Sequence, residues 1–74
     1  MKNGDQTKYE IVIYWDDDDH IFVAEVPELP GCKAHGDTEV GAVRNVKEAI
    51  NLWIETAREF GDNIPKPRRH PVAA

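Results

Sequence analysis

The spacing of hydrophobic positions changes from a strand-like to a helix-like period about halfway along the chain. Tyr9–Trp15 is rich in β-branched and aromatic residues, and apolar residues dominate His20–Val26, so both segments predict strands. Between them, Asp16-Asp17-Asp18-Asp19 has low strand propensity and predicts the turn of a hairpin. A short third strand, at about Cys32–His35, is expected to extend this hairpin into a sheet.

The second half of the chain predicts one long amphipathic helix from about Glu39 to Phe60. Asp37 or Thr38 can cap its first N–H groups, and Gly61 can adopt the left-handed conformation that ends a helix. At 100° per residue, the apolar side chains gather on about half of the helix circumference. They are Val40, Val43, Val46, Ile50, Trp53, Ile54, Ala57 and Phe60. Leu52 stands apart from them among polar neighbours.

These elements predict an α+β fold in the order β-β-β-α, with a three-stranded antiparallel sheet and the helix packed on one face. Seventy-four residues suffice for one small domain, which we place at residues 8–67. Residues 1–7 are polar and are expected to form a flexible N-terminus. Residues 68–74 are expected to form a basic tail or a short fourth edge strand.

A single helix covers only one face of such a sheet. The opposite face would present Val12 and Tyr14 to water, and burial of apolar surface is worth about 25 cal/mol per Å². A chain this small needs that burial for stability. We therefore expect a homodimer or higher oligomer in which Val12 and Tyr14 form the contact.

The charge is distributed unevenly. The net charge is −5, but residues 1–65 carry fourteen acidic and six basic residues, and the tail adds Lys66, Arg68 and Arg69. An acidic body repels phosphate backbones, which disfavours direct nucleic-acid binding. The same charge suits a basic protein partner, because complementary potentials accelerate encounter.

Candidate catalytic and metal-binding groups are few. The single cysteine cannot form an internal disulfide, and the three histidines lack metal-ligand spacing. The four consecutive aspartates fit a solvated turn, an acidic contact for a basic partner or a metal site, in that order of preference. A nuclease would need Glu10, Glu25 and a turn aspartate to converge. We predict no catalytic residues, no metal and no cofactor.

One motif carries more information than the composition. Val26-Pro27-Glu28-Leu29-Pro30-Gly31-Cys32 is followed by Gly36-Asp37-Thr38 at the start of the predicted helix. Together with the hairpin, the helix and Ile64-Pro65-Lys66-Pro67, this motif resembles the core of the HicB-like antitoxin family. In that family an acidic residue often stands three places after the threonine, whereas this chain has Gly41, so its helix start should be weaker.

The resemblance implies a partial ribonuclease-H-like fold and a role in a type II toxin–antitoxin pair. HicB-like antitoxins neutralise a small basic HicA-type toxin that cleaves messenger RNA. We expect that toxin to bind the hairpin turn and the proline-containing loop, and no DNA binding, because the chain stops where the DNA-binding domain of many relatives would begin. The expected contact residues are Asp16, Asp17, Asp18, Asp19, Pro27, Glu28, Leu29, Pro30 and His35.

Two alternatives remain open. The chain could be an orphan oligomeric domain of the same fold with another ligand or a structural role, or, as the weakest alternative, a metal-dependent nuclease. No apolar run approaches the length of a membrane span, so we expect a cytoplasmic protein without membrane contact.

Overall fold

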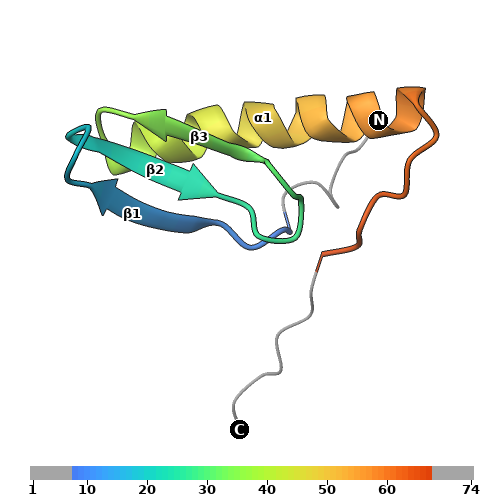
Figure 1. Ribbon diagram of the computed structural model, residues 1–74, viewed down its shortest axis with the longest axis horizontal. Helices are drawn as coiled ribbons and strands as arrows, with labels where there is room; N and C mark the ends of the chain where they lie inside the picture. The colour runs from blue at the N-terminus through green and yellow to red at the C-terminus, as the bar shows by residue number, and fades with distance from the viewer. Residues whose placement is uncertain (1–7, 68–74) are drawn as a thin grey trace, which may run out of the picture.

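The computed structural model describes residues 8–67 and confirms the predicted α+β fold (Figure 1). Three strands, β1 (Val12–Asp16), β2 (Ile21–Glu25) and β3 (Lys33–Gly36), precede the helix α1 (Glu39–Glu59). The strands form one antiparallel sheet in the order β1-β2-β3. The expectations for residues 1–7 and 68–74, including the fourth strand, lie outside the described residues.

The register of the strands determines which side chains face the helix. Ile13, Ala24 and Ala34 lie opposite one another across the three strands and therefore share one face of the sheet. This face packs against α1, because Ala24 is fully buried in a cluster that contains helix residues. The other side, which we call the open face, consists of Val12, Tyr14, Asp16, Ile21, Val23, Glu25, Lys33 and His35.

The middle of the helix supplies the core, as its periodicity predicts. Its buried residues are Ala42, Val46, Ile50, Ile54 and Ala57. The prediction was wrong at both ends, because the exposed fractions of Val40 and Phe60 are 69% and 72%. A helix of 21 residues is about 31 Å long, whereas strands of four or five residues reach only about 17 Å. The helix therefore extends past the sheet at its C-terminal end, where Phe60 is uncovered. At its N-terminal end β3 reaches Ala42, but Val40 lies two residues earlier, so its side chain points about 200° away around the helix.

Both ends of α1 have the predicted caps. The Thr38 hydroxyl accepts a hydrogen bond from the Gly41 N–H at 2.9 Å. At the C-terminal end, Gly61 has a φ of 70°, and its N–H donates to the Arg58 carbonyl at 3.2 Å. The Asp62 N–H donates to the Ala57 carbonyl at 2.8 Å, which completes a Schellman motif.

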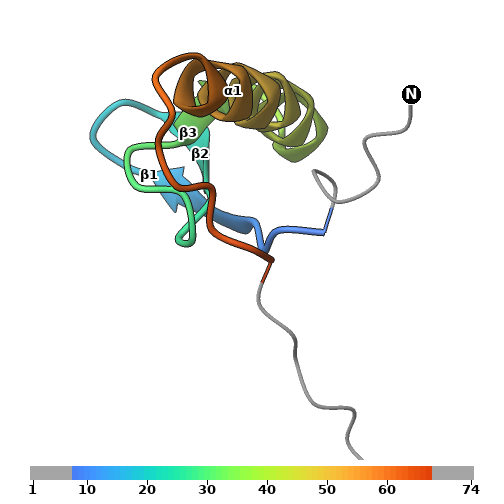
Figure 2. The ribbon, with the colours of Figure 1, turned by 90° about the vertical axis from the view of Figure 1, so that its right-hand side faces the viewer.

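The first strand begins three residues later than predicted, because the residues before it make other contacts. Tyr9 is buried, and its hydroxyl donates to the backbone carbonyl of Pro65. The Glu10 N–H donates to the Glu28 carboxylate at 3.0 Å instead of joining the sheet. The segment after α1 thus returns to the start of the described chain, as Figure 2 shows.

The helix does not lie over the centre of the sheet. In Figures 1 and 2, β3 is the strand nearest to α1 and β1 is the farthest. Ile13 and Trp15 point to the helix side of the sheet, yet their exposed fractions are 38% and 46%. The expectation that only the opposite face is uncovered was therefore incomplete, because both faces of β1 are exposed.

Candidate functional site

The acidic turn, Asp16–Asp19, is organised by its own side chains. The Asp16 carboxylate accepts hydrogen bonds from the N–H groups of Asp18 and Asp19 at 3.0 and 3.1 Å. The Asp17 carboxylate accepts from the Trp15 indole at 3.3 Å. Asp16 is therefore a structural residue of the turn. The exposed carboxylates of Asp18 and Asp19 give the turn its negative surface.

The proline loop, Pro27–Gly31, is held by backbone hydrogen bonds. The Val26 N–H donates to the Cys32 carbonyl at 3.0 Å, the Leu29 N–H to Val26 at 3.1 Å, and the Cys32 N–H to Leu29 at 2.9 Å. Gly31 has a φ of 79°, in the left-handed region that favours glycine. These bonds give the loop one well-defined path.

Two side-chain hydrogen bonds to other parts of the chain fix the outside of this loop. The Trp53 indole on α1 donates to the Pro30 carbonyl at 2.9 Å, while Glu28 binds the Glu10 N–H. Pro27 and Pro30 remain exposed, so the loop presents a rigid apolar surface. Leu29 is fully buried in the core. We correct its assignment as a partner contact, since its side chain anchors the loop and is not accessible.

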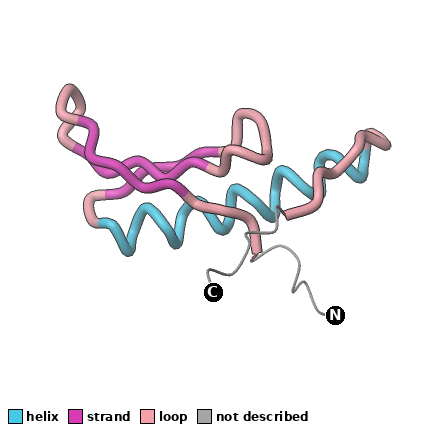
Figure 3. The backbone as a smooth tube through the Cα atoms, turned by 90° about the horizontal axis from the view of Figure 1, so that it is seen from below, coloured by secondary structure: helices cyan, strands magenta, loops and turns pink. Residues whose placement is uncertain are grey.

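The expected contact residues do not form one cluster. The acidic turn precedes β2 and the proline loop follows it, so they lie at opposite ends of the sheet, about 17 Å apart (Figure 3). His35 lies between them on the open face, opposite Val23. Only a partner that spans the open face can contact all three.

The open face is apolar in its middle and has charged groups around it. The Tyr14 hydroxyl donates to the Glu25 carboxylate at 2.6 Å. The pKa of Tyr14 is raised, first by this hydrogen bond, then by desolvation and by the charges of Glu25 and Asp16. Glu25 also lies opposite Lys33 on β3. The face can therefore bind a protein surface, and the raised pKa of Tyr14 keeps its hydroxyl protonated, which disfavours it as a nucleophile.

Metal chemistry finds little support in residues 8–67. No group of three or more His, Cys, Asp or Glu side chains is placed to hold a metal ion within that range. Glu25 lies opposite Val12, so Glu10 is not its direct cross-strand partner. Burial raises the pKa of the Cys32 thiol, which disfavours the reactive thiolate.

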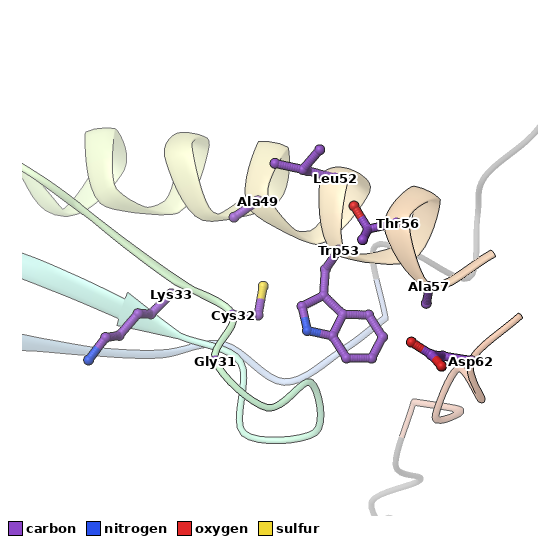
Figure 4. Close-up of a pocket in the computed structure, with 9 residues that line it drawn as sticks. All are labelled: Gly31, Cys32, Lys33, Ala49, Leu52, Trp53, Thr56, Ala57 and Asp62. Atoms are coloured by element: carbon purple, nitrogen blue, oxygen red, sulfur yellow. The ribbon is translucent and has the colours of Figure 1, made fainter. Parts of the chain in front are cut away.

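The sequence did not predict one surface, an apolar groove of about 420 Å³ between α1 and the start of β3, the strand that follows the proline loop. Figure 4 shows the Trp53 indole beside Cys32 in this groove, while the Lys33 side chain extends away from it. Leu52, whose exposed fraction is 65%, lines the groove from the helix. Its position among polar neighbours was the one sequence signal that pointed there.

Within residues 8–67 the structure has one helix, α1, and its charged residues make it too polar to span a membrane. No helix within these residues meets the length and hydropathy that a membrane span requires.

Comparison with known proteins places this sequence in a family. A UPF0150 protein from Thermoplasma acidophilum is 41% identical over 65 residues, which cover 88% of this chain and 93% of the relative. A UPF0150 protein from Archaeoglobus fulgidus is 38% identical over 55 residues, 74% of this chain and 78% of the relative. An uncharacterised 14.9 kDa protein of Haemophilus phage HP1 is 44% identical over 45 residues, 61% of this chain but only 34% of the phage protein.

No solved structure matches the chain significantly. The family model that describes a HicB-like antitoxin of bacterial toxin–antitoxin systems matches residues 9–72. This match includes the hairpin, the proline loop, the Gly36-Asp37-Thr38 helix start and α1. The chain therefore belongs to the HicB-like antitoxin family.

Proposed function

We propose that this chain is the toxin-binding module of a type II toxin–antitoxin pair and that it neutralises a small basic HicA-type toxin that cleaves messenger RNA. The family match over residues 9–72 carries this proposal, because it implies an antitoxin role. Within the described residues, no metal-ligand cluster competes with it as a functional site.

The toxin would bind across the open face, from the acidic turn to the proline loop. The turn supplies exposed carboxylates that attract a basic protein, and Pro27 and Pro30 supply a rigid apolar contact that loses little conformational entropy on binding. Tyr14 and His35 lie between these ends. Their aromatic and imidazole side chains suit the centre of a protein interface.

Co-expression with a small basic HicA-type toxin, sought first in the reading frames next to this one, tests the proposal. That protein alone should arrest growth, and this chain should restore growth and co-purify with it. Absence of both rescue and co-purification would contradict the proposal and leave an orphan oligomeric domain as the better account.

A matched pair of variants separates a specific interface from a general charge effect. The triple change of Asp17, Asp18 and Asp19 to Asn removes three charges next to the open face and spares the structural Asp16. The triple change of Glu48, Glu55 and Glu59 to Gln removes three charges from the solvent side of α1, where all three are exposed. Only the first variant should weaken rescue.

A further inference from the structure

The strand β1 is unusual because it exposes apolar side chains on both faces of the sheet. The exposed fractions are 40% for Val12 and 42% for Tyr14 on the open face, and 38% for Ile13 and 46% for Trp15 on the helix side. Within residues 8–67, β1 is also an edge strand, because β2 is the one strand that pairs with it there. Its second edge therefore presents backbone donors and acceptors between two rows of apolar side chains.

The opposite edge of the sheet is protected. β3 lies beside α1, and the Asn45 side chain on the helix donates to the backbone carbonyl of His35 on β3 at 2.8 Å. The charged Lys33 also belongs to this strand. β1 contains no lysine or proline, and no helix of the described residues covers its outer edge; these are the usual means of blocking an edge. The two edges thus differ in the way expected if only β1 is meant to pair.

We propose that β1 pairs antiparallel with β1 of a second copy of this chain, so that two sheets join into one continuous six-stranded sheet. With the two-fold axis near Tyr14, the central residue of the strand, Ile13 of one copy faces Trp15 of the other on the helix side. Such cross-strand pairs of aromatic and β-branched residues stabilise sheets. This assignment does not depend on the proposed toxin binding.

Edge pairing explains the exposed residues better than stacking of two open faces. Stacking would cover Val12 and Tyr14 but would leave Ile13 and Trp15 in water, because these two point to the helix side. Edge pairing sets Ile13 against Trp15 and Tyr14 against Tyr14, places Val12 opposite Asp16 and diagonally beside Tyr14 of the second copy, and satisfies the backbone groups of the edge. The expected contact at Val12 and Tyr14 is thereby kept and extended to both faces.

Charge favours the antiparallel over the parallel orientation. A parallel pair would place two acidic turns, with four aspartates each, side by side. An antiparallel pair keeps the two acidic turns at opposite ends of the joined strands.

Light scattering at micromolar concentration tests the pairing with the full chain. The expected mass is twice the 8.4 kDa of one chain. Val12→Asp, which would face Asp16 of the second copy, and Ile13→Lys, on the opposite face of β1, should each shift the protein to the monomer. Val40→Lys and Leu52→Lys alter side chains that are 69% and 65% exposed elsewhere, and both should keep the dimer. Circular dichroism identifies any variant that fails to fold.

Cross-linking gives a second measurement. In the antiparallel pair, residues opposite each other have Cα atoms about 4.5–5.5 Å apart, within the range of a disulfide. Tyr14→Cys should therefore form a covalent dimer under mild oxidation, whereas Leu52→Cys at the same concentration should not.

Three outcomes would overturn the proposal. A mass of 8.4 kDa at every concentration would exclude self-association. Dissociation by Val12→Asp but not by Ile13→Lys would indicate stacking of open faces. A monomeric chain whose toxin binding is abolished by Ile13→Lys would assign the β1 edge to the toxin. By contrast, loss of toxin rescue with an intact dimer would contradict the proposed function and leave the pairing of β1 unaffected.

Discussion

Ile50 occupies the centre of the contact between the helix and the sheet. Its exposed fraction is 1%, and it belongs to the same buried cluster as Ala24 and Leu29. In so small a domain, each fully buried side chain supports a large share of the stability, because few others are available. Ile50 therefore tests the helix periodicity at its most sensitive position.

Replacing Ile50 by Ala should lower the free energy of unfolding by about 2–5 kcal/mol, because it removes buried methyl groups and leaves a cavity. Leu52→Ala removes a similar number of atoms from an exposed position and should cost less than about 1 kcal/mol. Denaturant titration of both variants measures the difference. Equal losses would show that the buried face of α1 is misassigned.

Gly36 explains part of the family motif in physical terms. A Cβ atom at this position would lie 2.6 Å from the backbone nitrogen of Ala42 and 2.8 Å from the Gly41 carbonyl carbon. Both are backbone atoms of α1 and cannot rotate away. The glycine is therefore required where β3 approaches the helix closely, and the reason is space.

We expect Gly36→Ala to destabilise the fold by about 1–3 kcal/mol, the usual cost of overpacking. Gly41→Ala is the matched control, because its Cβ would meet only the Thr38 hydroxyl, at 3.1 Å, which can shift. Alanine is also the better helix former, so this control should lose less stability than Gly36→Ala. Thermal unfolding of the two variants measures the order, and the reverse order would contradict the account.

At the level of elements, local signals determined what the sequence could predict. Thr38 and Gly61 marked the helix ends correctly, because capping depends on neighbouring residues alone. The predicted start of β1 at Tyr9 was wrong, because the Tyr9 hydroxyl donates a hydrogen bond to Pro65, which is 56 residues away in the sequence. Pattern analysis along the chain contains no information about such a partner.

The same limit applies to the candidate site. The aspartate run predicted an acidic turn, but only the register shows that the proline loop lies at the opposite end of β2. Helix periodicity predicted which side of α1 is buried, but not its position over β3. The exposure of Ile13 and Trp15 follows from that position and could not be predicted.

The acidic turn is the element whose charge can be tested separately from its shape. Changing Asp17, Asp18 and Asp19 to Asn should slow association with the toxin and flatten the dependence of the association rate on salt, because steering charges are removed. The dissociation rate should change less. Stopped-flow or surface-based kinetics at several salt concentrations measure both rates, and an unchanged association rate would exclude electrostatic steering by the turn.

On the scale of the whole molecule, the two proposed interfaces occupy different surfaces. The toxin is assigned to the open face between the acidic turn and the proline loop, and the second copy to the edge of β1. Val12 and Tyr14 lie where these surfaces meet, since both residues belong to β1 and to the open face. Variants at Ile13, on the helix side of β1, and the triple variant of Asp17, Asp18 and Asp19 therefore separate self-association from toxin binding most cleanly.

The central claim is that this chain neutralises a toxin that cleaves messenger RNA. The most direct measurement is the rate of RNA cleavage by a purified small basic HicA-type toxin, titrated with this chain. We expect the rate to fall in proportion to the added chain and to reach zero at a fixed stoichiometry. Undiminished cleavage in the presence of excess folded chain would contradict the claim.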